Sequence, residues 1–218
     1  MKVKKIFSIF LILILSLNYR YMNCYSLSQK NIFKEVLSQV STEETFTYLC
    51  VNWSENFISD IKAYEDDIKT SFRREGIDIN NYTYKEDEYN LKAATLNITK
   101  NKKSYVFSIK IKIRGYKEDD IKEFIQKIHK SLNLKESNLR ISINIKTKLS
   151  NVEKIDLAKI KVEEYLHKKD YYADTVKFHN GYSAKVSAKD REDFQYLLCS
   201  YDTGDYLIIG DSEIFISY

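Results

Sequence analysis

Apolar and polar residues alternate strictly in two segments of the chain. Residues 108–114 are SIKIKIR, so a β-strand here would turn three isoleucines to one face and basic side chains to the other. Residues 140–148 repeat the pattern, with isoleucines at positions 141, 143 and 145. A sheet covered on one face alternates in this way, whereas a sheet covered on both faces is apolar throughout. The two segments therefore predict strands of a sheet that carries helices on one face only.

Elsewhere the apolar spacing switches between three or four residues, typical of helices, and two residues, typical of strands. We expect Ser150 to cap the last helix, with Glu153 completing a capping box. Ser54 leads from the first strand into the second helix, which Gly76 ends. The predicted helices span residues 29–40, a segment ending near 75, 117–132 and 150–167, and the predicted strands span 46–53, 77–84, 89–99, 104–114, 139–149, 175–178, 182–186, 194–201, 206–209 and 214–218.

A strand, a helix and further strands follow one another twice along the chain. The two copies cover about 45–135 and 139–218. Neither copy would bury enough apolar surface alone, because each has few strands and little helix to cover them. We therefore predict one α+β domain over residues 27–218, in which two repeats form one antiparallel sheet with helices on one face.

The first 26 residues have the pattern of an export signal. Lys2, Lys4 and Lys5 precede an apolar segment from Ile6 to Leu17, which is 12 residues long. A membrane-spanning helix needs about 20 residues, so the segment fits a signal peptide cleaved after Ser26. An uncleaved N-terminal anchor is the alternative. A lipoprotein modified at Cys24 is a third, but the residues before it are too bulky for the usual small-residue box.

The excess of positive charge lies in this export segment. The whole sequence has 35 Lys and Arg and 31 Asp and Glu, and four of the cations fall in residues 1–26. The remainder is neutral, but residues 92–161 carry 18 cations and 7 acids. Both basic strands lie in this stretch. The domain therefore lacks the overall positive charge of a nucleic-acid-binding protein, and any anion site would be local.

Few residues suggest catalysis or cofactor binding. The three histidines, His129, His167 and His179, are far apart and unpaired with cysteines, so no metal site is expected. The five glycines are dispersed, which excludes a phosphate-binding loop, and no G-x-S-x-G nucleophile motif is present. The acidic clusters Asp66-Asp67, Glu86-Asp87-Glu88 and Asp119-Asp120 are more typical of helix termini and turns. We predict no enzyme activity and no cofactor.

Two cysteines, Cys50 and Cys199, remain after removal of the export segment. Exported proteins form disulfides, so one long-range bridge is possible. Both residues lie in predicted strands, where a cysteine also packs as a small apolar side chain. The sequence leaves the choice between a disulfide and two buried thiols open.

The order of elements and the C-terminal residues resemble the YwmB family. The resemblance rests on Gly181-Tyr182-Ser183, on the strand 194–201, and on the segment from Tyr206 to Tyr218 with Gly210. The chain departs from the family pattern at Ser200, Asp211-Ser212 and Ser217. The resemblance implies an exported protein of low-GC Gram-positive bacteria with a fold like that of the TATA-box-binding protein. It supplies no catalytic residues, because the family has none established.

These observations favour a non-catalytic, extracytoplasmic binding or interaction domain of the cell envelope. Its ligand would be an anionic envelope polymer, a lipid headgroup or an envelope protein. Nucleic acid is disfavoured, because the domain is neutral and lacks the apolar wedges of a minor-groove binder. Ser108, Ser142 and Asn144 would donate hydrogen bonds between the cations. The candidate site residues are Lys110, Lys112, Arg114, Arg140, Lys146 and Lys148.

Three alternatives remain open at this point. In the first, the cations would be solvent-exposed side chains of the sheet that bind no ligand. In the second, the protein would be a structural subunit. An envelope hydrolase would instead need a deep cleft with two carboxylates about 5–9 Å apart. The oligomeric state is not predicted.

A chain that starts at Leu27 is expected to be soluble and to unfold cooperatively, because residues 1–26 would serve export and not folding. Circular dichroism during thermal unfolding of this shortened chain measures this. Aggregation without a cooperative transition would show that the apolar segment belongs to the fold.

Overall fold

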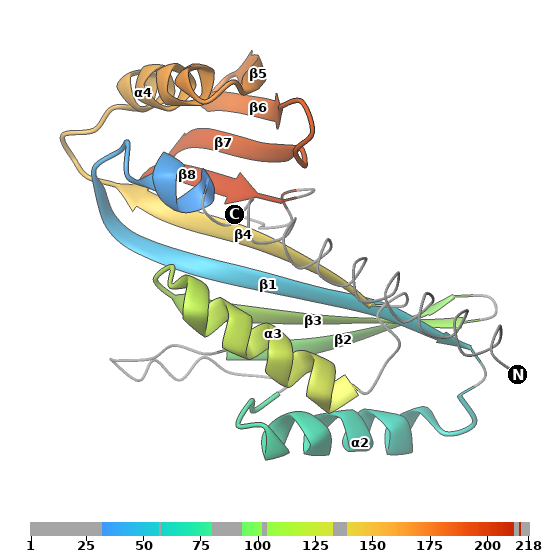
Figure 1. Cartoon of the computed structure of the whole chain (residues 1–218). Coiled ribbons are helices and arrows are strands. Elements are labelled where there is room, and N and C mark those ends of the chain that lie inside the picture. Colours follow the sequence, from blue (N-terminus) through green and yellow to red (C-terminus); the bar gives the residue numbers. More distant parts are fainter. Residues whose placement is uncertain are drawn as a thin grey trace, which may run out of the picture.

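Eight strands form one antiparallel sheet in the order β2-β3-β1-β4-β8-β7-β6-β5 (Figure 1). The structure is a computed structural model that describes residues 32–56, 58–79, 93–101, 104–132, 139–211 and 214. The strands are β1 (Thr42–Asn56), β2 (Ala93–Asn101), β3 (Ser104–Arg114), β4 (Leu139–Leu149), β5 (Tyr172–Phe178), β6 (Gly181–Ser187), β7 (Phe194–Tyr201) and β8 (Gly204–Gly210).

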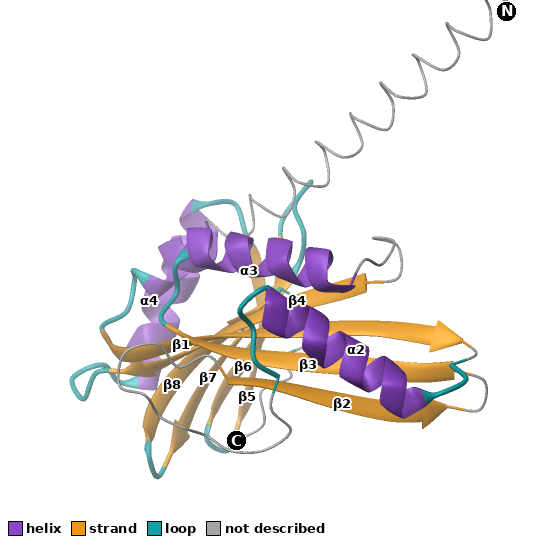
Figure 2. Ribbon diagram, turned by 90° about the horizontal axis from the view of Figure 1, so that it is seen from below, coloured by secondary structure: helices purple, strands orange, loops and turns teal. Residues whose placement is uncertain are grey.

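The helices lie on one face of this sheet. They are α2 (Ile61–Arg74), α3 (Glu118–Leu132) and α4 (Ile155–Lys168), and residues 32–37 are also helical. Figure 2 shows α2 and α3 crossing the same side of the strands. Phe33 packs edge-on against Phe194 of β7, with ring centroids 5.5 Å apart, and Tyr64 of α2 packs against Phe107 of β3 at 5.1 Å. The prediction of an α+β protein with one antiparallel sheet is confirmed.

β1 lies at the centre of the longest pairings in the sheet. It pairs with β3 from Phe46↔Arg114 to Asn56↔Ser104, and with β4 from Thr42↔Leu149 to Trp53↔Leu139. The odd-numbered residues of all three strands point toward the helices. Burying each such side chain contributes roughly 1.5–3 kcal/mol. The completely or almost completely buried members include Leu49, Val51, Trp53, Phe107, Ile109, Ile111 and Ile145.

The predicted boundaries of β3 and β4 match the structure, whereas the first strand and second helix differ. β1 extends to Asn56, so Ser54 lies inside the strand. The N-cap of α2 is Asp60, whose Oδ1 accepts from the backbone N–H groups of Lys62 at 2.9 Å and Ala63 at 3.1 Å. A carboxylate at this position satisfies N–H groups that have no partner within the helix.

The predicted capping box at Ser150 is wrong. α4 begins at Ile155, and its N-cap, Lys154, makes no side-chain cap hydrogen bond. Glu153 is instead 4% exposed and accepts from Lys161 Nζ at 2.9 Å on both carboxylate oxygens. Its Oε2 also accepts from the backbone N–H of Ser41 at 3.3 Å. Glu153 therefore joins the start of β1 to α4 across 112 residues of sequence.

A second polar cluster fixes β5 under α4. Glu163 of α4 accepts hydrogen bonds from Thr175 of β5 at 2.6 Å, from Tyr196 of β7 at 2.9 Å and from Lys159 at 2.6 Å. Burial opposes ionisation of this carboxyl, but the three donors outweigh it and lower the pKa of Glu163. The charged form thus holds the edge strand to the helix layer.

Some predicted elements lie wholly or partly outside the described residues. These are the export segment, most of the strand predicted at 77–84, the start of that at 89–99, and most of the strand at 214–218. Ile79 forms an isolated parallel bridge with Ala94 of β2. In the described part of the chain, no helix is both long and apolar enough to cross a membrane.

Replacing Glu153 by Ala is expected to lower the free energy of unfolding by about 1–3 kcal/mol, because the Lys161 and Ser41 donors lose a buried acceptor. Glu164→Ala is the matched control, since Glu164 is an exposed glutamate on α4, the helix that carries Lys161. Urea unfolding of the two variants measures the difference. Equal stability of both would show that the Glu153 contacts contribute nothing to the fold.

Candidate binding face

The second face of the sheet lies opposite the helices and is formed by the even-numbered residues of β1, β3 and β4. The registers align these residues in rows across the three strands. Lys110 and Ser142 lie on either side of Cys50, and Lys112 and Asn144 on either side of Tyr48.

The rows continue toward both ends of the three strands. Arg114 and Lys146 flank Phe46, and Lys148 lies beside Glu44. At the other end, Ser108 and Arg140 flank Asn52. All six predicted cations are therefore on the same face of the sheet.

The six cations form two columns and not one cluster. Lys110, Lys112 and Arg114 follow β3, while Arg140, Lys146 and Lys148 follow β4. β1 runs between them, so the columns are about 10 Å apart. The β1 residues between the columns are uncharged from Phe46 to Asn52. A ligand that bridged the columns would cross this neutral strip.

Acidic residues neutralise one end of the columns. Lys148 Nζ lies 3.1 Å from the carboxylate of Glu43, and Arg114 lies 3.5 Å from that of Glu44. The hydrogen bond to Glu43 raises the pKa of Lys148, which stays protonated. These two cations are thus already compensated within the protein, although the pairs are solvent-exposed enough to exchange with another anion.

Aromatic rings hold two further cations. Lys112 Nζ lies 4.0 Å from the ring centroid of Phe46, and Lys146 Nζ lies 4.5 Å from that of Tyr206 on β8. Such cation–π contacts contribute about 0.5–1 kcal/mol at exposed sites. These lysines therefore have a packing role besides any binding role.

Lys110 and Arg140 lie on the second face away from Glu43 and Glu44. Both side chains are exposed, and they lie toward the end of the strands that carries Ser108 and Asn52. No ion pair involving Arg140 is found among the described residues. This exposed, polar end of the second face, away from Glu43 and Glu44, is where an incoming anion would have the best access.

The expected donors Ser142 and Asn144 are not accessible. Ser142 is 6% exposed and Asn144 is completely buried. A Cβ on Gly210 of β8 would lie 2.6 Å from Asn144 Nδ2 and 3.3 Å from Ile214 Cγ1, so β8 and Ile214 crowd this part of the face. Only Ser108, at the other end, remains partly exposed. The hydrogen-bonding role predicted for Ser142 and Asn144 therefore fails.

The two cysteines are free thiols and both are buried. Cys50 lies in β1 and Cys199 in β7, and the strand order places β4 and β8 between them. Three strand intervals span about 14 Å, which exceeds the roughly 7 Å limit between the α-carbons of a disulfide. Burial raises the pKa of Cys199, which keeps this thiol protonated. The arrangement fits two packed thiols and excludes an intramolecular bridge.

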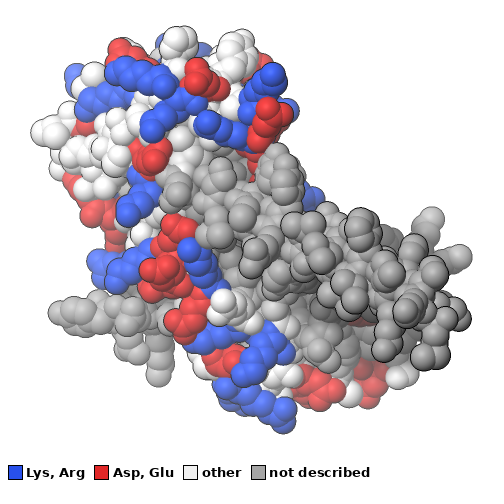
Figure 3. All heavy atoms as spheres, in the orientation of Figure 1, with Lys and Arg blue, Asp and Glu red and all other residues white. Residues whose placement is uncertain are grey.

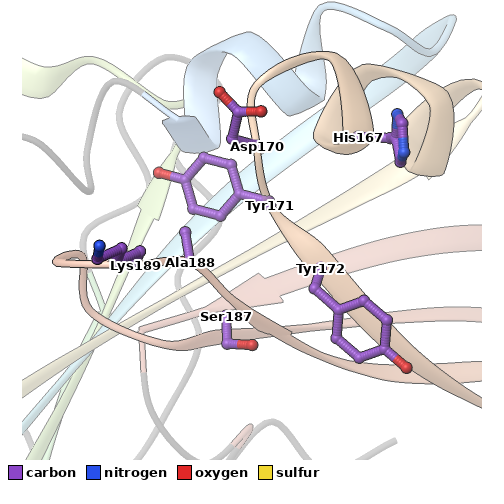
Figure 4. A pocket seen from close by; sticks show the side chains of 7 residues that line it. All are labelled: His167, Asp170, Tyr171, Tyr172, Ser187, Ala188 and Lys189. Carbon is purple, nitrogen blue, oxygen red and sulfur yellow. The ribbon is translucent and has the colours of Figure 1, made fainter.

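A hollow of about 480 Å³ lies at the far end of the sheet, between the end of α4 and the strands β5 and β6. Figure 4 shows His167 and Lys189 at opposite ends of its lining, so the two do not converge on one point. Its single carboxylate, on Asp170, cannot act as a pair in glycoside hydrolysis. The lining residues are His167, Asp170, Tyr171, Tyr172, Ser187, Ala188 and Lys189.

The other candidate groups from the sequence do not assemble into a site. Asp119 and Asp120 lie in the first turn of α3, where the helix dipole favours acids, and Asp66 and Asp67 are exposed on α2. The acidic cluster at 86–88 lies outside the described residues. Among those that are described, no three His, Cys, Asp or Glu side chains are grouped as a metal site.

The helix-bearing side differs in charge pattern from the second face. Figure 3, which views the molecule from the side of α3 and α4, shows blue and red residues intermingled over the helices. Ion pairs within the helices account for part of this mixture, including Lys122–Glu118 at 3.0 Å and Lys159–Glu163 at 2.6 Å. On the visible helices the two signs of charge are therefore mixed, whereas each column on β3 and β4 carries one sign.

Comparison with known proteins adds little. No family model matches the chain, and no curated protein matches it. A crystal structure of a hydrolase from Listeria innocua is 8% identical and has a TM-score of 0.18, with 78% of this chain and 87% of that chain covered. A likeness at this level carries no argument about fold or activity.

Proposed function

We propose that this protein is a non-catalytic, extracytoplasmic binding domain of the cell envelope, whose second face binds an anionic polymer. The observation that carries the proposal is the register of β1 with β3 and β4, which aligns six cations on one side of a sheet. Columns of like charge repel one another, and an anionic ligand would remove this cost.

The chemistry of the open end favours a polymer with repeated phosphate or carboxylate groups. Arg140 would bind such a group through two parallel N–H donors, and Lys110 would act as a point charge. The two columns are about 10 Å apart, so one chain of anionic groups could contact both. Ser108, partly exposed, would donate a further hydrogen bond. Shallow electrostatic binding of this kind is sensitive to salt.

The proposed location rests on the N-terminal sequence. The cationic start and the apolar segment to Leu17 support export, either as a cleaved signal or as an anchor at the outer face of the cytoplasmic membrane. Export also separates the domain from the chromosome, which disfavours DNA as the ligand. Anionic envelope polymers and lipid headgroups would both be within reach of such a protein.

We further propose that the chain is a divergent YwmB-like protein built from two TATA-binding-protein-like repeats. The topology supports this, since the first and last strands of each unit pair, β1 with β3 and β4 with β8, and β1 pairs with β4. α2 follows β1, and α4 follows β4. The Gly181-Tyr182-Ser183 element supports the family likeness. Gly181 is required at its position, because a Cβ there would lie 1.9 Å from the carbonyl oxygen of Leu198.

Replacing Lys110 and Arg140 together by Gln is expected to lower the salt concentration that elutes the protein from a polyphosphate matrix. These two positions suit a test of binding because both side chains are exposed on the second face. The free energy of unfolding should change by no more than about 1 kcal/mol. Elution salt and thermal unfolding are the two measurements.

Lys62→Gln/Lys168→Gln is the matched control, since it removes the same charge from exposed positions on α2 and α4. Equal loss of retention in both double variants would reduce the effect to net charge and contradict the proposed face. Retention that survives high salt would indicate another surface. Vesicles with anionic lipids, compared with polyphosphate, distinguish a headgroup from a polymer.

A further inference from the structure

We infer that the free edge of β5 pairs with β5 of a second copy of the chain, which joins two sheets into one across a two-fold axis. β5 ends the strand order and has β6 as its single neighbour in the described sheet. This surface is separate from the cationic second-face columns of β3 and β4, and the inference does not depend on the proposed ligand.

The backbone of β5 presents its hydrogen-bonding groups to a partner strand. Phe178 and Gly181 close the β5–β6 hairpin through a two-residue turn. Such a closing pair is hydrogen-bonded, and bonded pairs recur at every second residue of an antiparallel ladder. The N–H and C=O groups of Ala173, Thr175 and Lys177 therefore point outward from the edge, where they can extend the ladder.

The side chains of β5 are unusually apolar for an exposed edge. Tyr172 is 70% exposed and Val176 is 63% exposed, and both point to the same face as Phe178. Isolated edges of soluble proteins are normally protected by charges, prolines or bulges. Asp174 is the one charged residue among the four positions of β5 on this face. Lys177 on the opposite face of β5 is a second charged residue, so the apolar positions Tyr172, Val176 and Phe178 are what a partner strand would cover.

A second copy of β5 can pair with this edge with the two-fold axis at Thr175, which is the register that we propose. With the two-fold axis at Thr175, the outward-pointing groups of Thr175 meet their own symmetry mates, and Ala173 meets Lys177 of the other copy. On the exposed face Tyr172 then lies opposite Phe178, an aromatic cross-strand pair that occurs twice. Asp174 lies opposite Val176, so the two aspartates do not face each other. Moving the axis to Asp174 would place these like charges in direct opposition.

The other edge of the sheet is less suited to pairing. Ile79 already bridges Ala94 of β2, which occupies part of that edge. The exposed side chains of β2 include Asn97, Thr99 and Lys100, which are polar. β5 is also the more rigidly placed edge, because Thr175 is tied to Glu163 of α4. The inference therefore concerns β5 alone.

Substitutions at Val176 test both the edge and the register. Val176→Asp would place an aspartate opposite Asp174 of the other copy at two symmetric points, whereas Val176→Lys would place an opposite charge there. Like charges directly opposed in a sheet destabilise pairing, so we expect Val176→Asp to raise the dimer dissociation constant about tenfold and Val176→Lys to leave it unchanged or lower it. Sedimentation velocity of the full chain over a concentration series measures both.

The two variants control for each other, since each puts one charge at the same exposed position of the monomer. The inference is supported if the wild-type chain forms a dimer that Val176→Asp weakens and Val176→Lys does not. It is overturned if the wild-type chain is monomeric at tens of micromolar, if both variants weaken the dimer equally, or if neither does. Thermal unfolding of each variant checks that the fold is retained.

Discussion

The fold depends on β1 being paired along most of its length with both β3 and β4. β1 contains no glycine or proline, and its pairing with β4 shifts register only between Thr42 and Glu44, at the start of the strand. Because side chains alternate with a period of two, one register fixes the face of every residue on three strands. A shift by a single residue would move the isoleucines of β3 and β4 to solvent and the lysines into the core. The cost of that exchange makes the register, and with it the position of the cations, unambiguous.

The same constraint explains why the second face is not uniform. The register that gathers the cations also interposes the neutral residues of β1 and brings Phe46 beside Lys112. Toward β8 the face is closed, with Ile208 and Cys199 completely buried. The accessible positive charge is therefore concentrated at Lys110 and Arg140, away from Glu43 and Glu44. A ligand would meet a graded surface, with cations paired to Glu43 and Glu44 at one end and the exposed Lys110 and Arg140 at the other.

Structural features that depend on neighbouring residues could be predicted from the sequence, whereas features that depend on residues far away in the sequence could not. β3 and β4 were predictable to the residue, because the contrast between isoleucine and lysine at alternate positions is local. The capping box failed because Glu153 is drawn to Ser41, 112 residues away, and nothing near Ser150 signals that partner. Ser142 and Asn144 have strand spacing identical to that of their cationic neighbours. The burial of Asn144 follows from its pairing with Gly210 of β8, whose approach is a property of the tertiary structure.

The pairing of the cations could not be predicted either. Glu43 and Glu44 are far from Lys148 and Arg114 in the sequence, and strand pairing brings them together. Tyr206 contacts Lys146 only because β8 pairs with β4. These contacts do not change the face of the sheet on which each cation lies. They do reduce the number of cations that are available to a ligand. Only the strand order shows that acidic side chains and aromatic rings contact part of the charged face.

Chemical footprinting of lysines tests the account most directly. Acetylation of the folded protein, with and without inorganic polyphosphate and quantified by mass spectrometry, reports which amines a polyanion covers. The account predicts protection of Lys110 above all, weaker protection of Lys112 and Lys146, and none at Lys62 and Lys168 on the helices. Protection spread evenly over helices and strands, or protection that spares Lys110, would contradict a binding face formed by β3 and β4.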